Sequence, residues 1–364
     1  MLLQGIFPAI TTPFYPDGRL YLKKLEHNVD RYSRTPLSGM VVLGSTGETV
    51  MLSDEEQRSV LKLAIEVASH EKVLIAGVGQ ESAFQTLVGI EYAAKLGFDV
   101  ALVRTPTYYR PQMASKPEGL LAHYRFIADR SPLPVLLYSV PTFTAYDLPT
   151  DLVIQLAQHP NIIGIKESSG NVEKIAAIRA GTASVKHTVK VTEIFNAVTR
   201  RMNGENSGKP GVEQSGGLVS AESLGSTGGS TATATVAAPP PPKPKFKIRT
   251  KNVGFQILAG AAHKLLPSLV AGASGGVLAF AAAAPTACFE IHTAWKEGDL
   301  KLAEEKQERV SVAARRVASE LGVPGVKFGM DLNGYFGGLA RLPLLPLTGE
   351  EKIEVQKLLG DLRN

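Results

Sequence analysis

The stretch Ile162-Ile163-Gly164-Ile165-Lys166-Glu167-Ser168 runs from four residues without polar side chains into three polar ones. A run that is apolar at nearly every position is typical of a parallel strand covered on both faces. Similar short runs precede it at residues 5–11, 39–43, 73–77, 100–103 and 134–138. Helical patterns separate these runs, so the sequence predicts six strand–helix units that are complete by about residue 183.

The pattern resumes after residue 252 with apolar runs at 255–260 and 275–280, and a predicted helix over 263–271 lies between them. One of the earlier helices, predicted over 53–69, begins with Ser53-Asp54-Glu55-Glu56, which has the form of a capping box. Eight strands that alternate with helices, with no dinucleotide fingerprint after the first, favour a closed (β/α)₈ TIM barrel over an open doubly wound sheet.

The predicted organisation is a barrel over residues 1–290 and a C-terminal helical appendage over 291–364. In the appendage, helices are expected at 290–321, around 326–335 and at 350–362. A low-complexity insertion at about 203–250, rich in Gly, Ser, Thr, Ala and Pro, interrupts the barrel. Its composition predicts a surface loop or disordered linker, with a polyproline docking site or an anionic-surface tether as the alternative. Residues 184–202 are interpreted as partly helical, an extension of the sixth helix.

Composition limits the function classes. The 39 basic and 34 acidic residues give a net charge of +5, which is too small and scattered to indicate nucleic-acid binding and merely favours small anionic substrates. Cys288 is the single cysteine, so no intramolecular disulfide or thiolate cluster is expected. The seven histidines never fall three or four residues apart, and no metal site is predicted.

The N-terminal residues and one long uncharged segment bear on location. No basic residue precedes Arg19 and no small-residue cleavage site follows, so a cytoplasmic protein in a reducing compartment is expected. Residues 265–289 carry no charge and are long enough to span a bilayer. Pro267 and Pro285 interrupt this segment, which predicts a buried helix–strand–helix and no membrane association.

Lys166 stands at the end of the sixth predicted strand, where the active site of such a barrel lies. A partly desolvated lysine there can have a lowered pKa and attack a carbonyl as a free amine. The alternative is an exposed strand-end lysine paired with a carboxylate. Tyr138 ends the fifth strand and could move protons in a closed site, or it could serve packing alone.

Two further strand ends carry polar groups. Gly44-Ser45-Thr46-Gly47-Glu48 follows the second strand, and its amides and hydroxyls could bind a carboxylate; it could equally be a helix-capping loop. The stretch Thr105-Pro106-Thr107-Tyr108-Tyr109-Arg110 follows the fourth, and its tyrosines could also be surface or interface aromatics.

Taken in chain order, the stretches 44–48, 105–109, Tyr138-Ser139-Val140-Pro141 and 164–168 resemble the dihydrodipicolinate synthase/N-acetylneuraminate lyase family of class I aldolases. The resemblance covers nearly the whole chain except residues 185–252, and within the family it is greatest to 4-hydroxy-2-oxoglutarate aldolases. It implies that Lys166 forms a Schiff base with a 2-oxo acid and that Tyr138 is the proton donor and acceptor. It also implies a relay through Thr46 and Tyr109, and substrate contacts from Ser45, Thr46, Ser168 and Gly260.

The same resemblance implies no cofactor and a homo-oligomer, a dimer or tetramer, in which Tyr109 reaches a neighbouring subunit's site; Tyr108 could take that role. The implied reaction is cleavage of 4-hydroxy-2-oxoglutarate to pyruvate and glyoxylate. Pro141 is followed by Thr142, Phe143 and Thr144, where lysine-biosynthetic members carry a carboxylate-binding arginine. This departure weighs against dihydrodipicolinate synthesis, which stays an alternative beside a 2-keto-3-deoxy sugar-acid aldolase or dehydratase. A non-catalytic 2-oxo-acid-binding barrel or scaffold is the alternative from another class.

Overall fold

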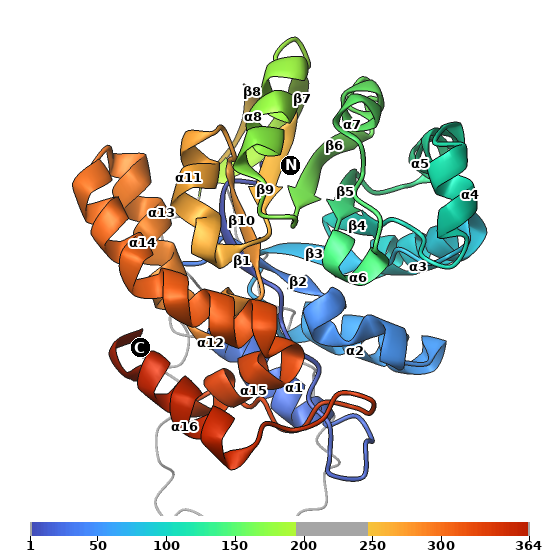
Figure 1. Cartoon of the computed structure of the whole chain (residues 1–364). Helices are drawn as coiled ribbons and strands as arrows, with labels where there is room; N and C mark the ends of the chain where they lie inside the picture. The colour runs from blue at the N-terminus through green and yellow to red at the C-terminus, as the bar shows by residue number, and fades with distance from the viewer. Residues whose placement is uncertain (1, 194–246, 363–364) are drawn as a thin grey trace, which may run out of the picture.

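The computed structural model describes residues 2–193 and 247–362 of the chain. Eight parallel strands lie in the order β1-β10-β9-β6-β5-β4-β3-β2, and a bridge between Ala9 and Val41 brings β1 beside β2 and closes the barrel (Figure 1). The strands are β1 (Gly5–Pro8), β2 (Gly39–Val42), β3 (Val73–Gly77), β4 (Val100–Arg104), β5 (Val135–Ser139), β6 (Ile162–Glu167), β9 (Gln256–Ala259) and β10 (Gly275–Leu278). The predicted TIM barrel is confirmed.

Helices surround the barrel and bury its outer face. They are α1 (Leu22–Ser33), α2 (Asp54–Val67), α3 (Ala83–Leu96), α4 (Arg110–Ser115), α5 (Glu118–Arg130), α6 (Pro141–Thr144), α7 (Thr150–Leu156), α8 (Val172–Gly181), α11 (Leu265–Val270) and α12 (Phe280–Ala283). The predicted capping box is confirmed: the Ser53 hydroxyl accepts from Glu56 N, and the Glu56 carboxylate accepts from Ser53 N. Inside the barrel, a separate apolar cluster includes Phe7, Leu136, Leu258 and Tyr138.

The C-terminal region contains α13 (Pro285–Glu297), α14 (Leu300–Ala314), the π-helical turn η5 (Arg315–Glu320), α15 (Gly322–Leu332) and α16 (Gly349–Leu358). The continuous helix expected over 290–321 is wrong. Gly298 adopts a left-handed conformation and ends α13, and the Asp299 carboxylate accepts from Leu302 N to start α14. The expected boundary between residues 290 and 291 falls within α13, and the division into two domains stays a prediction.

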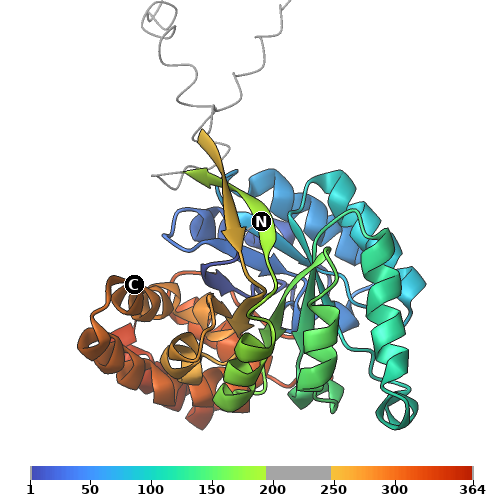
Figure 2. The ribbon, with the colours of Figure 1, turned by 90° about the horizontal axis from the view of Figure 1, so that it is seen from above.

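The residues after α8 form a strand and no helix, which corrects the expectation for the described part of 184–202. Strand β7 (His187–Glu193) pairs antiparallel with β8 (Lys247–Val253). The run Thr188-Val189-Lys190-Val191-Thr192 is rich in β-branched residues, which favour a strand once a partner is present, and that partner lies beyond the insertion in the sequence. Figure 2 shows this ribbon projecting away from the barrel. The insertion at 203–245 lies outside the described residues.

The uncharged segment at 265–289 is part of the barrel wall. It contains α11, β10, α12 and the start of α13, so the predicted helix–strand–helix is confirmed. Among the residues that the structure describes, no helix has the length and apolar character needed to cross a membrane.

Candidate active site

A cavity of about 250 Å³ lies at the carboxyl ends of the barrel strands. Six of the seven predicted site residues line it: Ser45, Thr46, Tyr138, Lys166, Ser168 and Gly260. The C-terminal region supplies part of the wall through residues of η5 and α15, namely Ala318, Ser319, Gly322, Val323 and Val326. The C-terminal helices are therefore part of the site and more than an appendage.

Lys166 is almost completely buried, with 4% of its surface exposed. Its ammonium lies 4.0 Å from the centre of the Tyr138 ring, and the two residues are paired in the register of β5 and β6. Within residues 2–193 and 247–362, no carboxylate forms an ion pair with Lys166; the adjacent Glu167 instead pairs with Lys174 at 2.8 Å. The alternative of an exposed, paired lysine is therefore not what the structure has.

Polar residues on the outer side of β5 and β6 hold these strand ends in place. Lys174 pairs with Glu167 and also with Asp147, which accepts a 3.0 Å hydrogen bond from the Ser139 hydroxyl. Glu167 also accepts a 2.7 Å bond from Ser169 N. Because side chains alternate along a strand, fixing Ser139 and Glu167 outward directs the residues before them into the barrel.

Tyr138 contacts a hydroxyl on the turn after β2. Its phenol oxygen lies 3.2 Å from Ser45 Oγ, and Ser45 begins the 3₁₀ turn η1 (Ser45–Gly47). The Thr12 hydroxyl supports this turn by donating to Gly47 O at 2.7 Å. Thr46 is buried and lines the cavity, but the hydroxyl within reach of Tyr138 belongs to Ser45. A relay role for Thr46 stays a prediction.

Tyr109, the seventh predicted residue, does not line the cavity. Tyr108 and Tyr109 precede α4, are 79% and 65% exposed, and contact each other edge to face. Glu81, which the sequence reading missed, accepts hydrogen bonds from the backbone amides of Thr107 and Tyr108. Burial raises the pKa of Glu81, but these bonds, together with those from the Thr107 hydroxyl and the Arg104 guanidinium, outweigh it and lower the pKa to about 2. The loop is thus anchored with both tyrosine rings facing outward.

Gly260 and Ser168 approach each other closely beside Lys166. A Cβ added to Gly260 would lie 2.0 Å from Ser168 Oγ, so only glycine fits here. Gly260 N donates to Glu167 O at 2.7 Å, which ties the end of β9 to that of β6. The Ser168 hydroxyl is buried and has no hydrogen-bond partner in the described part of the chain. It is thus a free polar group at the wall of the cavity.

His263 lines the cavity and was missed from the sequence. Burial lowers its pKa, and the positive charges of Arg315 and Lys264 lower it further, so the imidazole is neutral near pH 7. Its only sequence signal is its place three residues after Gly260. Ser319 could not be identified as a cavity residue from the sequence, because it belongs to a helical region whose packing onto the barrel mouth cannot be predicted from neighbouring residues.

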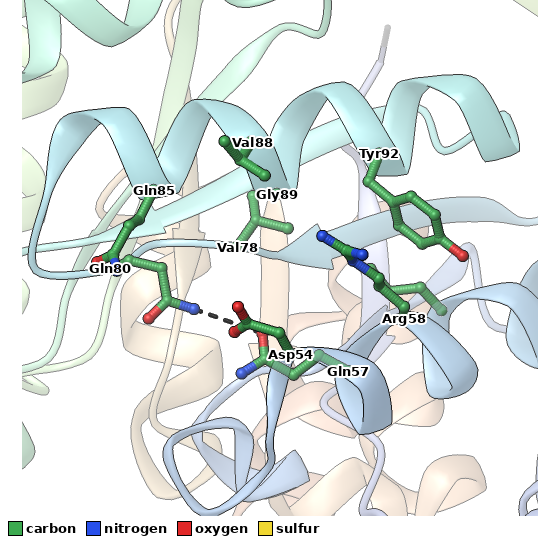
Figure 3. Close-up of a pocket in the computed structure, with 10 residues that line it drawn as sticks. Asp54, Gln57, Arg58, Val78, Gln80, Gln85, Val88, Gly89 and Tyr92 are labelled. Atoms are coloured by element: carbon green, nitrogen blue, oxygen red, sulfur yellow. Dashed lines mark hydrogen bonds between the residues drawn. The ribbon is translucent and has the colours of Figure 1, made fainter.

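A second cavity, of about 290 Å³, lies on the outside of the barrel between α2 and α3 (Figure 3). Gln57, Arg58 and Gln80 line one part of it, and Arg58 lies 5.5 Å from the centre of the Tyr92 ring. Among the residues that the structure describes, no strand-end lysine or tyrosine lines it. The inner cavity, which gathers six predicted residues, is the candidate active site.

Comparisons with known proteins agree with this geometry. A model of the dihydrodipicolinate synthetase family matches residues 2–191 and 245–362. The 4-hydroxy-tetrahydrodipicolinate synthase of Methanothrix thermoacetophila is 29% identical over the whole of both chains. The enzyme of that name from Xanthomonas campestris pv. campestris is 41% identical over 180 residues, 50% of this chain and 58% of that protein.

A solved structure has the same fold over nearly the whole length. The dihydrodipicolinate synthase of Acinetobacter baumannii, crystallised with pyruvate, superposes with a TM-score of 0.73 and 26% identity over 99% of both chains. The match on either side of the insertion, together with this superposition, shows that the chain belongs to the dihydrodipicolinate synthetase family and is an enzyme of the lyase class.

Proposed function

We propose that the protein is a class I aldolase that binds pyruvate as a Schiff base on Lys166. The observation that carries this proposal is the buried Lys166 ammonium, which faces the Tyr138 ring and has no carboxylate partner among the described residues. The Lys166 amine is available to a carbonyl that enters the cavity.

In the proposed reaction the Lys166 amine adds to C2 of the 2-oxo acid, and the carbinolamine loses water to give an iminium ion. The iminium accepts the electron pair of the C3–C4 bond when that bond breaks, which leaves an enamine; the reverse step forms the bond. Tyr138 takes the proton of the C4 hydroxyl during cleavage and returns it during condensation. Because the iminium is the electron sink, these steps use neither a metal nor a nucleotide cofactor.

The Ser45–Gly47 turn is the proposed site of the 2-oxo acid's carboxylate. The Ser45 hydroxyl, 3.2 Å from the Tyr138 phenol, can also pass a proton to or from it. Ser168 has a free buried hydroxyl, and Gly260 leaves room beside it. With the carboxylate bound at this turn, C3 and the second half of the substrate would lie toward Phe143, His263 and Ser319, which also line the cavity.

The identity of the second substrate has two candidates. The names of the relatives support condensation with aspartate semialdehyde, as in 4-hydroxy-tetrahydrodipicolinate synthesis, and none of the relatives reported above is named as a 4-hydroxy-2-oxoglutarate aldolase. The pocket supports cleavage of 4-hydroxy-2-oxoglutarate, because Phe143 lines it and no arginine is among its described lining residues. Both reactions use the same enamine.

We also propose a cytoplasmic homo-oligomer in which Tyr109 reaches the site of a neighbouring subunit. The exposure of the anchored Tyr108–Tyr109 pair supports this arrangement.

Borohydride trapping tests the Schiff base. Incubation with pyruvate and borohydride is expected to inactivate the enzyme and add a reduced pyruvyl mass to the peptide that carries Lys166, and Lys166→Met is expected to abolish both. Lys306→Met is the control, because it removes a lysine that pairs with Glu290 and does not line the cavity, and it leaves Lys166 and its neighbours in place. A label on another lysine would overturn the mechanism. Specificity constants for the two second substrates then decide between the two reactions.

A further inference from the structure

Glu48 and Lys327 form a buried ion pair that no step of the proposed reaction uses. The Lys327 ammonium lies 2.5 Å from Glu48 Oε1, and the two side chains are 0% and 1% exposed. Glu48 directly follows the Ser45–Gly47 turn, whereas Lys327 belongs to α15. The pair therefore joins the turn at the cavity to a helix of the C-terminal region.

The Lys327 ammonium also donates hydrogen bonds to two backbone carbonyls. It donates to Thr12 O at 2.9 Å and to Leu339 O at 2.8 Å. Thr12 is the residue whose hydroxyl donates to Gly47 O. One ammonium thus touches Glu48, which ends the turn, and Thr12, which supports it. The ammonium therefore makes two hydrogen bonds to backbone carbonyls in addition to its ion pair with Glu48.

Glu48 has a backbone conformation that needs support. Its φ is 56°, in the left-handed region that residues with a side chain rarely adopt, and it links two consecutive 3₁₀ turns. Its other carboxylate oxygen, Oε2, accepts a 2.8 Å bond from Arg341 N. Such a conformation persists only where surrounding contacts hold it.

Arg341 ties the same region to the start of α2. Its guanidinium donates to Met51 O at 2.7 Å and to Glu56, the capping-box residue of α2. Positions 48, 51 and 56 are therefore held by the side chains of Lys327 and Arg341, both of which lie beyond residue 320.

The electrostatics make the pair interdependent. Burial lowers the pKa of Lys327, and the Glu48 carboxylate opposes this shift. Asp331 on the same helix also opposes it, while Arg341 adds to the lowering. Removing one partner would leave a buried charge with its main counter-charge gone, whereas removing both would leave none.

We propose that Glu48 and Lys327 are positioning residues that hold Ser45 and Thr46 in the geometry that binds the 2-oxo acid carboxylate. The choice of ligand rests on the function proposed above, and the mechanical role does not. The C-terminal region thereby becomes part of the substrate-binding machinery without touching the substrate through this pair.

Hydrogen exchange tests the mechanical role without substrate. Three variants of the full chain are compared: Lys327→Met, the double variant Glu48→Gln/Lys327→Met, and the control Lys306→Met. The control removes an ion pair of similar length, 2.7 Å to Glu290, in the same C-terminal region but away from the turn. In both Lys327 variants the amides of residues 44–52 are expected to exchange at least tenfold faster than in wild type, with strands β3 and β4 unchanged. The control is expected to match wild type throughout.

Kinetics test the consequence for binding. In the double variant the KM for pyruvate is expected to rise on the order of tenfold, while kcat falls by a smaller factor because Lys166 and Tyr138 are untouched.

If Lys327→Met does not fold, the double variant decides, since it buries no unpaired charge. Unchanged exchange and KM in the double variant, or equally faster exchange across the whole barrel, would overturn the proposal. Absence of a pyruvate adduct on the wild-type enzyme would instead refute the proposed function, and exchange would still decide on the positioning role.

Discussion

The strand ends of β5 and β6 and the C-terminal helices meet at one cavity, but they contribute different things to it. Tyr138 and Lys166 are register partners on adjacent hydrogen-bonded strands, so the sheet itself sets their separation. The C-terminal region contributes Ser319, Val323 and Val326 as wall, and Lys327 beneath the Ser45 turn. The groups proposed to react come from the barrel strands, whereas the C-terminal region adds wall residues and an ion pair that supports the Ser45 turn.

This division has a physical basis. A strand in a closed parallel sheet has neighbours on both sides, so its end is held more firmly than a loop and suits groups that must keep a fixed distance. Helices packed over the barrel mouth can change in length and side chain without disturbing strand register. We therefore expect substitutions in the two regions to have different signatures: loss of turnover in the first, and altered binding or stability in the second.

Tyr138→Phe should give the largest effect among changes that keep Lys166. The phenyl ring still packs against the Lys166 ammonium, but the hydroxyl that lies 3.2 Å from Ser45 is gone. Turnover is expected to fall by about 10²–10⁴-fold, the contribution typical of a general acid–base group. Steady-state rates measure this loss, and borohydride trapping of pyruvate measures imine formation separately.

The comparison between the two readouts decides the role of Tyr138. Imine formation that persists while turnover falls supports proton transfer. If both fall together, Tyr138 is a binding or packing residue. The expectation that substitutions at the strand ends act on turnover would then be wrong.

The sequence predicts the first region well because its signals are local. Strands at Val73–Gly77 and Gly275–Leu278, and the placement of Lys166 at the end of β6, follow from short apolar runs that stop at a polar residue. The Ser53 capping box occupies four consecutive residues and is predicted from the sequence for the same reason. In each case, the residues that determine the structure lie within a few positions of one another.

Features that depend on contacts distant in sequence, in the second region and elsewhere, are poorly predicted. Arg341 and Glu48 are 293 residues apart, and nothing near either one indicates the other. The local sequence predicts helix where β7 forms, because the partner strand β8 begins only at Lys247. The exposed position of Tyr109 follows from the anchoring of its loop by Glu81, which no motif around Tyr109 reveals.

Acid stability should distinguish the barrel from the C-terminal region less sharply, since each contains a histidine whose pKa is strongly lowered. Burial lowers the pKa of His123 in α5 to about 4, and burial followed by Lys296 lowers that of His292 in α13 to about 4. Both lie below the value of about 6.5 expected in the unfolded chain. The folded state therefore binds fewer protons, and the stability that each neutral ring contributes is complete above pH 6.5 and is lost as the pH falls toward 4.

Each histidine is expected to reduce the free energy of unfolding by about 2 kcal/mol between pH 7 and pH 5. Urea unfolding at the two pH values measures the loss, and His123→Phe and His292→Phe should each remove their share because phenylalanine keeps a ring and cannot be protonated. A variant whose pH dependence equals that of wild type would show that its histidine is protonated without cost in the folded state.

The smallest effect is expected from the part of the chain that belongs to neither region. Residues 203–245 are dominated by Gly, Ser, Thr, Ala and Pro, and such a composition has too little apolar surface to offset the entropy of ordering. In the sequence this segment falls between the paired strands β7 and β8, and the family match resumes at residue 245. Replacing 203–245 with a short Gly-Ser bridge should therefore leave the thermal midpoint and kcat/KM nearly unchanged, because loop length changes closure entropy only slowly. Calorimetry and steady-state assays of the shortened chain, beside the full-length protein, check this. Loss of soluble folded protein would make the segment a third structural region, and an unaltered midpoint with lost activity would place it at the active site.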